Sequence, residues 1–80
     1  MNKPEYEIYE DGVNEWRLDE VPHREDGPAA EWPNGDKGWY LNGEIHREDG
    51  PAIEYANGYN SWFLNNEPTD PETIVDLWLM

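Results

Sequence analysis

The 80-residue sequence has no cysteine, one serine, one phenylalanine and two histidines, and it lacks any long apolar run. Without cysteine there is neither a disulfide framework nor a thiolate zinc site, which favours a reducing, cytoplasmic location. No apolar stretch is long enough to span a bilayer. The first ten residues lack the apolar core of a secretory signal, so we expect neither membrane insertion nor export.

Basic residues are also scarce, because five Lys and Arg face nineteen Asp and Glu, giving a formal net charge of −14. This excludes a nucleic-acid-binding protein that neutralises phosphates, and it argues against an anionic membrane surface as partner. The mean hydropathy of −1.07 is low, but 14% of the residues are aromatic. Because disordered acidic chains are poor in aromatic residues, we predict one folded, acidic, β-rich domain over residues 1–80.

An internal repeat organises the chain. The segment His23–Ala29 (His-Arg-Glu-Asp-Gly-Pro-Ala) recurs unchanged at His46–Ala52, which is an offset of 23 residues. The same offset relates further identical pairs: Glu31 and Glu54, Asn34-Gly35 and Asn57-Gly58, Trp39 and Trp62, Leu41-Asn42 and Leu64-Asn65. A diverged first copy contains Tyr9, Asp11-Gly12, Trp16 and Leu18. We therefore divide the chain into three units, 5–22, 23–45 and 46–68, which is about the smallest number that buries a shared core.

Each unit has the pattern of a β-hairpin, because Asn-Gly or Asp-Gly between alternating apolar residues is typical of a two-residue type I′ turn. With such a turn at Asn34-Gly35, Trp32 would face Lys37 and Ala30 would face Trp39. One side of the sheet would then carry Ala30, Trp32, Trp39, Leu41, Ile53, Tyr55, Trp62, Leu64, Tyr9, Trp16 and Leu18, with Glu7 as an exception. The other side would carry Ala29, Glu31, Tyr40, Glu54, Tyr59, Ser61 and Phe63.

The segments between and after the hairpins are also informative. A second tight turn is expected at Asn42-Gly43, followed by a short strand over 44–46. At the C-terminus, Thr69 to Glu72 fits a capping box, and Ile74, Leu77 and Trp78 follow helical spacing. The predicted fold is thus mainly β: a single-layer antiparallel meander of three hairpin repeats of 23 residues, with a C-terminal α-helix over 70–80. That helix would cover the Trp/Leu side of the sheet or dock a partner.

The run Trp39-Tyr40-Leu41-Asn42-Gly43-Glu44-Ile45-His46 resembles the MORN type of repeat, in which units of similar length form chains of β-hairpins. The resemblance covers residues 5–68. The chain departs from the MORN pattern in having one more residue between Trp and Gly, and Arg-Glu-Asp where the family has Gly soon after His. The His-Arg-Glu-Asp-Gly-Pro-Ala segment is similar to a MORN-like variant in short proteins of phages and bacteria. The resemblance implies a scaffolding or binding role.

The histidines, two pairs of acidic residues and the single serine are the candidates for chemistry. His23 and His46 each precede an Arg-Glu-Asp triplet, but the arginine would repel a metal ion, so we expect no metal and no cofactor. The alternative is structural: each His packs beside the Trp of its unit while Arg and Asp brace the turn. The pairs Glu25/Asp26 and Glu48/Asp49 are conceivable acid–base groups, and Ser61 has no partner His. A single-layer sheet offers no deep pocket for them, so we expect no catalytic residues and no enzyme.

The acidity is the main functional signal, because a net charge of −14 exceeds the magnitude of about 2–8 that solubility requires. We predict a module that binds a protein partner with a basic surface, through Glu31, Tyr40, Glu48, Asp49, Glu54, Tyr59 and Phe63. The most concrete form is a phage-type inhibitor that occupies the nucleic-acid-binding surface of a host defence complex, in the manner of anti-CRISPR proteins. The alternatives are a scaffold or self-assembly module, including a homodimer, and an antitoxin-like neutraliser of a basic toxin.

Overall fold

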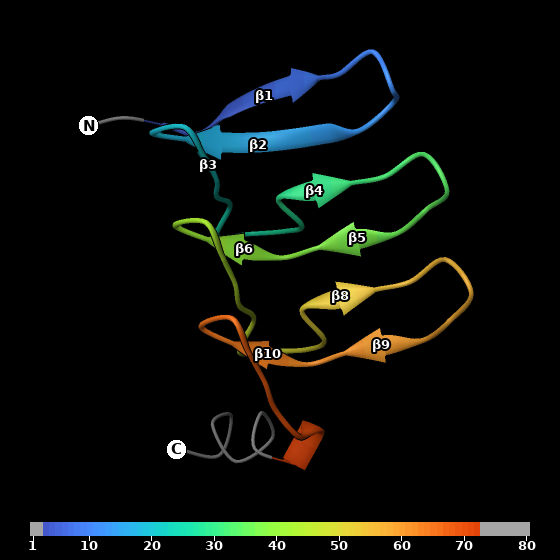
Figure 1. Cartoon of the computed structure of the whole chain (residues 1–80). Coiled ribbons are helices and arrows are strands. Elements are labelled where there is room, and N and C mark those ends of the chain that lie inside the picture. The colour runs from blue at the N-terminus through green and yellow to red at the C-terminus, as the bar shows by residue number, and fades with distance from the viewer. Residues whose placement is uncertain (1–2, 73–80) are drawn as a thin grey trace.

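The computed structural model describes residues 3–72, which form antiparallel β-sheets (Figure 1). The prediction of a mainly β chain is confirmed. The strands are β1 (Glu5–Ile8), β2 (Asn14–Leu18), β3 (Val21–Pro22), β4 (Ala30–Glu31), β5 (Lys37–Gly38), β6 (Tyr40–Leu41), β7 (Glu44–Ile45), β8 (Ile53–Glu54), β9 (Asn60–Ser61), β10 (Phe63–Leu64) and β11 (Glu67–Pro68). Pro71 and Glu72 have helical backbone, and the rest of the helix predicted over 70–80 lies outside the described residues.

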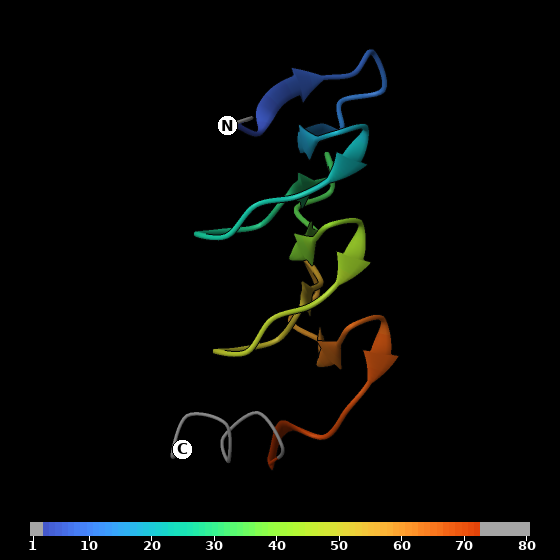
Figure 2. The ribbon, with the colours of Figure 1, turned by 90° about the vertical axis from the view of Figure 1, so that its left-hand side faces the viewer.

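The strands assemble in chain order. A seven-stranded sheet has the order β1-β2-β4-β5-β8-β9, with β3 paired to β2, while β6-β7 and β10-β11 form two small hairpins. Each unit thus contributes one long hairpin and one short hairpin, and the long hairpins follow one another down the molecule (Figure 1). The view at right angles shows the same succession (Figure 2). The principal dimensions are 38 × 35 × 18 Å, so the chain forms a thin slab.

The turns of the long hairpins differ from the prediction. The N–H of Gly35 donates to the carbonyl of Trp32 over 3.0 Å, and the N–H of Trp32 donates to the carbonyl of Asp36 over 2.9 Å. In this turn only Gly35 has a positive φ, of 98°. That geometry is a three-residue loop, a type I turn followed by a left-handed glycine. The predicted two-residue type I′ turn is therefore wrong here, and the loops at Gly12 and Gly58 repeat the same hydrogen bonds.

The longer loop changes the register by one residue. Ala30 pairs with Gly38, where the prediction paired it with Trp39, and Glu31 pairs with Lys37. Since side chains alternate between the two sides of a strand, a shift of one residue exchanges the sides of the whole second strand. Trp39 and Leu41 therefore leave the side of Ala30 and Trp32, and Tyr40 joins it.

The first unit confirms the corrected register. Glu7 pairs with Glu15 and Tyr6 with Trp16, and the rings of Tyr6 and Trp16 are 4.9 Å apart. Glu7 is thus no exception among apolar residues, because it faces another carboxylate on the opposite side of the sheet from Trp16.

The type I′ geometry occurs instead in the short hairpins. Asn42 and Gly43 have φ values of 52° and 82° and join β6 to β7, so the tight turn predicted there is confirmed. The equivalent residues are Asp19 and Glu20 in the first unit and Asn65 and Asn66 in the third. Left-handed backbone at both central residues matches the right-handed twist of the flanking strands.

Burial is slight throughout residues 3–72. The only fully buried apolar residues there are Ala29, Ala30 and Ala52, at 0–2% exposure, and His23 is 8% exposed. The tryptophans at 16, 39 and 62 are half-buried. Large side chains thus lie flat on the sheet, and the fold depends on the contacts between units more than on a thick apolar core. Within the same residues, no helix has the length and apolarity needed to cross a membrane.

Glu20 has a φ of 72°, a conformation that costs a non-glycine residue about 1–2 kcal/mol. We expect Glu20→Gly to raise the free energy of unfolding by about 0.5–1 kcal/mol, since the backbone carbonyl that accepts from Arg17 is retained. Urea unfolding followed by tryptophan fluorescence measures it. The control is Glu44→Gly in β7, at a residue without positive φ, which should lower stability; equal effects of the two substitutions would contradict the explanation.

Candidate functional site

The repeated segments His23–Ala29 and His46–Ala52, here called the two brackets, each hold an arginine against a tryptophan. The Arg47 guanidinium lies 3.9 Å from the ring centroid of Trp39. Its Nε donates to Asp49 Oδ1 over 2.8 Å and its Nη1 donates to the Pro51 carbonyl over 3.1 Å. This geometry uses the planar fork of arginine and its affinity for an aromatic face at once.

The first bracket repeats these contacts. The Arg24 guanidinium lies 5.0 Å from the Trp16 ring centroid, and it donates to Asp26 over 3.0 Å and to the Pro28 carbonyl over 3.2 Å. The expectation that Arg and Asp brace the turn is therefore confirmed in both brackets.

The glycine of each bracket provides the space for the arginine. A Cβ at Gly50 would lie 2.8 Å from the Cζ atom of Arg47, and a Cβ at Gly27 would lie 2.9 Å from that of Arg24. Real Cβ atoms do not approach other atoms so closely, so each guanidinium packs directly on a glycine α-carbon. Any side chain there would push the arginine off its tryptophan.

The histidines tie neighbouring units together. The N–H of His23 donates to the Trp16 carbonyl of the preceding unit over 2.9 Å, and its Nδ1 accepts from the N–H of Asn42 in its own unit over 2.9 Å. His46 makes the same bonds to Trp39 and Asn65, both at 3.0 Å. An accepting Nδ1 requires the neutral ring with its proton on Nε2. Both histidines thus hold the left-handed turn of the following short hairpin in place.

The alanines complete the bracket. The N–H of Ala52 donates to the Ser61 carbonyl over 2.8 Å, and its carbonyl accepts from Trp39 over 2.7 Å. Ala29 is bonded likewise to Gly38 and Trp16. Both alanines are buried, so their methyl groups lie in the interior of the joint. The identity of the two segments therefore follows from structure: seven residues form one joint.

Three of the four carboxylates in the brackets make contacts within the chain. Asp26 and Asp49 are paired with their arginines, and the Glu48 Oε2 atom lies 3.5 Å from His46 Nε2. Among residues 3–72 no group of three or more His, Asp or Glu side chains is arranged to hold a metal ion. A groove of about 550 Å³ separates the two brackets, and its acidic rim comes from Glu25, Asp26, Glu48 and Asp49.

The side of the sheet that carries the brackets, here called the bracket face, also has a row of charges. The register aligns Glu31 with Lys37 and Lys37 with Glu54 across three strands. Glu54 lies 3.6 Å from Arg47 Nη1 as well. None of the carboxylates in residues 3–72 is buried, so the excess of negative charge lies at the surface.

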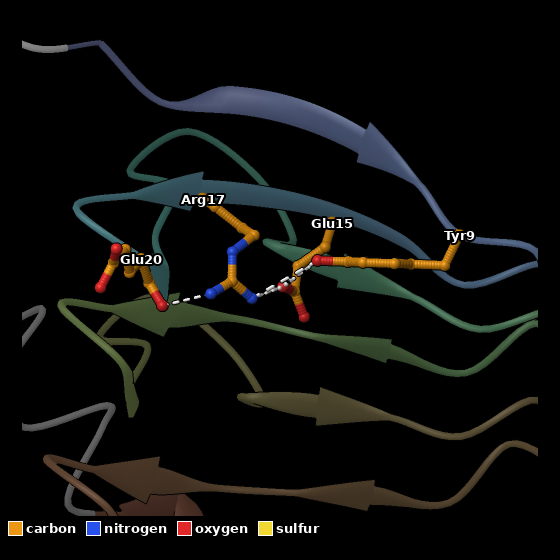
Figure 3. Close-up of polar contacts among 4 residues, drawn as sticks. All are labelled: Tyr9, Glu15, Arg17 and Glu20. Carbon is orange, nitrogen blue, oxygen red and sulfur yellow. Dashed lines mark hydrogen bonds and ion pairs between the residues drawn. The ribbon is translucent and has the colours of Figure 1, made fainter.

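The opposite side, here called the aromatic face, carries Tyr9, Glu15, Arg17, Trp32, Tyr40, Ile53 and Tyr55. In the first unit it holds a polar cluster (Figure 3). Arg17 Nη1 donates to Glu15 over 2.6 Å and to the Tyr9 hydroxyl over 3.4 Å, and the Tyr9 hydroxyl donates to Glu15 over 3.2 Å. Arg17 also donates to the Glu20 carbonyl (Figure 3). The charge on Glu15 is therefore largely neutralised within the chain.

The same cluster shifts the titration of its members. Desolvation by burial, followed by the charge of Glu15, raises the pKa of Tyr9, and the hydrogen bond to Glu15 raises the pKa of Arg17. Burial also raises the pKa of Tyr40, with further contributions from Glu15 and Tyr55. Each shift favours the protonated form. For the two tyrosines the reason is that a phenolate would be poorly solvated and would lie near a carboxylate, and for Arg17 it is that the carboxylate of Glu15 stabilises the charged guanidinium.

The second and third units present a groove on the aromatic face. It has a volume of about 500 Å³ and is lined by Trp32, Pro33, Asn34, Asp36, Tyr40, Ile53 and Tyr55. A Cβ at Gly38 would lie 2.9 Å from Tyr40 Cε1 and 3.3 Å from Trp32 Cη2. The two rings therefore lie over the backbone of Gly38. The sequence places Trp32, Ile53 and Tyr55 on the predicted apolar side without indicating a groove; Gly38, between Lys37 and Trp39, was the available signal that large rings cross this strand.

The predicted partner-binding residues do not form one surface. Glu31 and Glu54 lie on the bracket face, whereas Tyr40 lies on the aromatic face, because the three-residue loop exchanged the sides of its strand. Glu48 and Asp49 belong to the second bracket. The two remaining residues are Tyr59, which is 73% exposed near a hairpin loop, and Phe63, which pairs with Pro68 in the third short hairpin.

Comparisons with known proteins add no relative: no protein-family model matches the chain, and neither a curated protein nor a solved structure does. Function is therefore inferred from the geometry of the joints and of the two faces.

Arg47→Lys should lower the free energy of unfolding by about 1–2 kcal/mol, since an ammonium replaces the fork that reaches both Asp49 and the Pro51 carbonyl while stacking on Trp39. Urea unfolding measures the loss. The control is Lys37→Arg, an exchange of the same two cations at an exposed position, which should change stability by less than about 0.5 kcal/mol. A loss at position 37 as large as that at position 47 would refute the stacking argument.

Tyr40 should make stability fall at high pH. Its pKa is higher in the folded chain than in the unfolded one, so its contribution is complete below about pH 10 and is lost as the pH rises through the folded value. We expect Tyr40→Phe to flatten the decline in unfolding free energy above that pH, measured by urea titrations at successive pH values. The control is Tyr59→Phe, which removes an exposed phenol and should leave the decline as steep as in the parent.

Proposed function

We propose that the chain is a non-enzymatic, MORN-like array of three hairpin units that binds a cytoplasmic protein partner through acidic surface. The observation that carries the proposal is the internal use of its arginines. All three, Arg17, Arg24 and Arg47, are paired with carboxylates of the chain itself. With nineteen acidic residues against five basic ones, the surface left for a partner is strongly negative.

The brackets give this charge a regular arrangement. Glu25 and Asp26 lie in the first bracket and Glu48 and Asp49 in the second, and the arginine of each bracket makes equivalent bonds to its aspartate and to the proline carbonyl. Successive units are two strands apart, so the acidic pairs recur about every 10 Å along the array. A regularly spaced series of carboxylates presents negative charge as a nucleic-acid backbone does.

This arrangement supports a competitor of nucleic acid. A basic groove that binds phosphates by charge would accept the acidic pairs in their place, since electrostatic complementarity drives both associations. The partner class that fits is therefore a nucleic-acid-handling protein. Its inhibition by occupation of that groove is the most specific form of the proposal, including the case of a phage-type inhibitor of a host defence complex.

The test uses the immobilised chain to capture basic proteins from a host lysate, followed by elution with duplex DNA at constant ionic strength. We expect the captured partner to be released by DNA and to bind Glu25→Gln/Glu48→Gln about 3- to 20-fold more weakly. The control is Glu10→Gln/Glu67→Gln, which removes the same charge outside the brackets. Capture that is insensitive to DNA, or equally weakened by both pairs of substitutions, would end the proposal of a nucleic-acid competitor.

A second candidate function is self-assembly. Strands β1 and β9 are the two edges of the seven-stranded sheet, and an edge strand offers backbone groups to another chain. This candidate predicts oligomers, a homodimer being the smallest, whose mass rises with concentration in sedimentation velocity. A single concentration-independent monomer would exclude it, whereas the leading proposal expects a salt-sensitive complex with a different protein.

A further inference from the structure

Every arginine of the chain lies against an aromatic side chain. Arg24 and Arg47 lie over Trp16 and Trp39, and Arg17 contacts the Tyr9 hydroxyl. The chain thus holds a guanidinium on the bracket face by an indole ring and a carboxylate, and on the aromatic face by a carboxylate and a tyrosine hydroxyl.

The aromatic face of the second unit has this arrangement without the cation. At the offset of 23 residues, Trp32 replaces Tyr9 and Tyr40 replaces Arg17. Gly38 replaces Glu15, and a Cβ there would collide with both rings. Where the first unit is filled by its own arginine, the second therefore has two rings laid over a glycine and an open groove beside them.

The third unit closes the groove. Ile53 pairs with Gly38, and Tyr55 follows on the same side of the sheet, where it is 40% exposed. Asp36 stands at the rim: its Oδ1 accepts from the N–H of Ala56 over 2.7 Å and its Oδ2 accepts from Asn34 over 3.1 Å. These bonds hold the carboxylate in place beside the rings.

We propose that this groove, between Trp32, Tyr40 and Tyr55 with Asp36 at its rim, binds an arginine side chain of the basic partner. The inference rests on the proposed function, because it supplies the anchor by which a basic surface would be recognised. A cation fits better than a neutral apolar group, since three aromatic side chains and a carboxylate line the groove in a chain of net charge −14.

Arginine fits better than lysine for two reasons. A guanidinium is planar, so it stacks on an indole or phenol ring, and it is more weakly hydrated than an ammonium. The groove volume of about 500 Å³ accommodates the long side chain lying along the rings. The rigid rings themselves lose little rotamer entropy, as is typical of interface anchors.

The experiment compares octa-arginine with octa-lysine by isothermal titration calorimetry on the full chain at matched salt. The two peptides carry equal charge, so an acidic surface alone binds them alike. We expect octa-arginine to bind about 3- to 30-fold more tightly. Tyr55→Leu and Trp32→Leu, which keep apolar volume without the ring, should reduce this preference to less than about twofold.

The matched control is Tyr59→Leu, the same change at an exposed tyrosine of the same hairpin that does not line the groove; it should keep the preference. A readout that needs no substitution is the Trp32 indole N–H resonance, which octa-arginine should shift more than octa-lysine. Equal binding of the two peptides, or a preference that survives Tyr55→Leu and Trp32→Leu, overturns the groove while leaving the acidic surface intact. Failure of both peptides to bind overturns the acidic surface as well.

Discussion

The joint between units is the interaction on which the rest of the structure depends. A thin sheet with three buried alanines as its fully buried apolar residues in the described part gains little from a core. What holds it is an arginine packed on a tryptophan of the preceding unit and on a glycine α-carbon, together with a histidine that donates its backbone N–H to that tryptophan and accepts an N–H from its own unit. These interactions join only neighbouring units, but they recur at both joints, so each unit orients the next.

The two sides of the sheet consequently have different tasks. The bracket face uses two of the three arginines in joints, where they pair with Asp26 and Asp49, and its outward negative charge comes from the excess of carboxylates over these arginines. The aromatic face holds the remaining arginine in the first unit and an open groove beside Trp32 in the second. One repeated backbone thus carries charged groups and rings on both sides, with the rings of the bracket face stacked under arginines and those of the aromatic face lining an open groove.

The sequence alone predicts the repeat, the units, a tight turn at Asn42-Gly43 and the bracing of the turn by Arg and Asp, although it assigns the type I′ geometry to the wrong hairpin. It does not predict the register. Asn34-Gly35 is compatible with a two-residue and a three-residue loop, and the choice depends on whether Asn34 also adopts a left-handed φ. It does not, and the one-residue difference moved Tyr40 to the other face. Pairing Tyr6 with Trp16 removes Glu7 from the apolar side. The exceptional position of Glu7 in the predicted pairing was therefore the sign in the sequence that the predicted register was wrong.

The candidate site could be predicted only in part from the sequence, because the register was not predicted. Carboxylates on turns, such as Glu48 and Asp49, are found from sequence because their place does not depend on register. The groove is not, because Trp32 and Tyr40 come from different strands and meet only in the actual pairing. Composition shows how many charged and aromatic residues the chain has, whereas strand pairing determines which of them lie together in one site.

The brackets also bear on length. Each one is hydrogen-bonded to the unit before it and to the rest of its own unit, and these bonds are the same at both occurrences. Gain or loss of a whole 23-residue stretch at such a boundary would preserve every local bond while changing the span of the molecule by one step. In-frame duplication or deletion of one unit in the gene would therefore lengthen or shorten the binding surface while the hydrogen bonds of each joint stay the same.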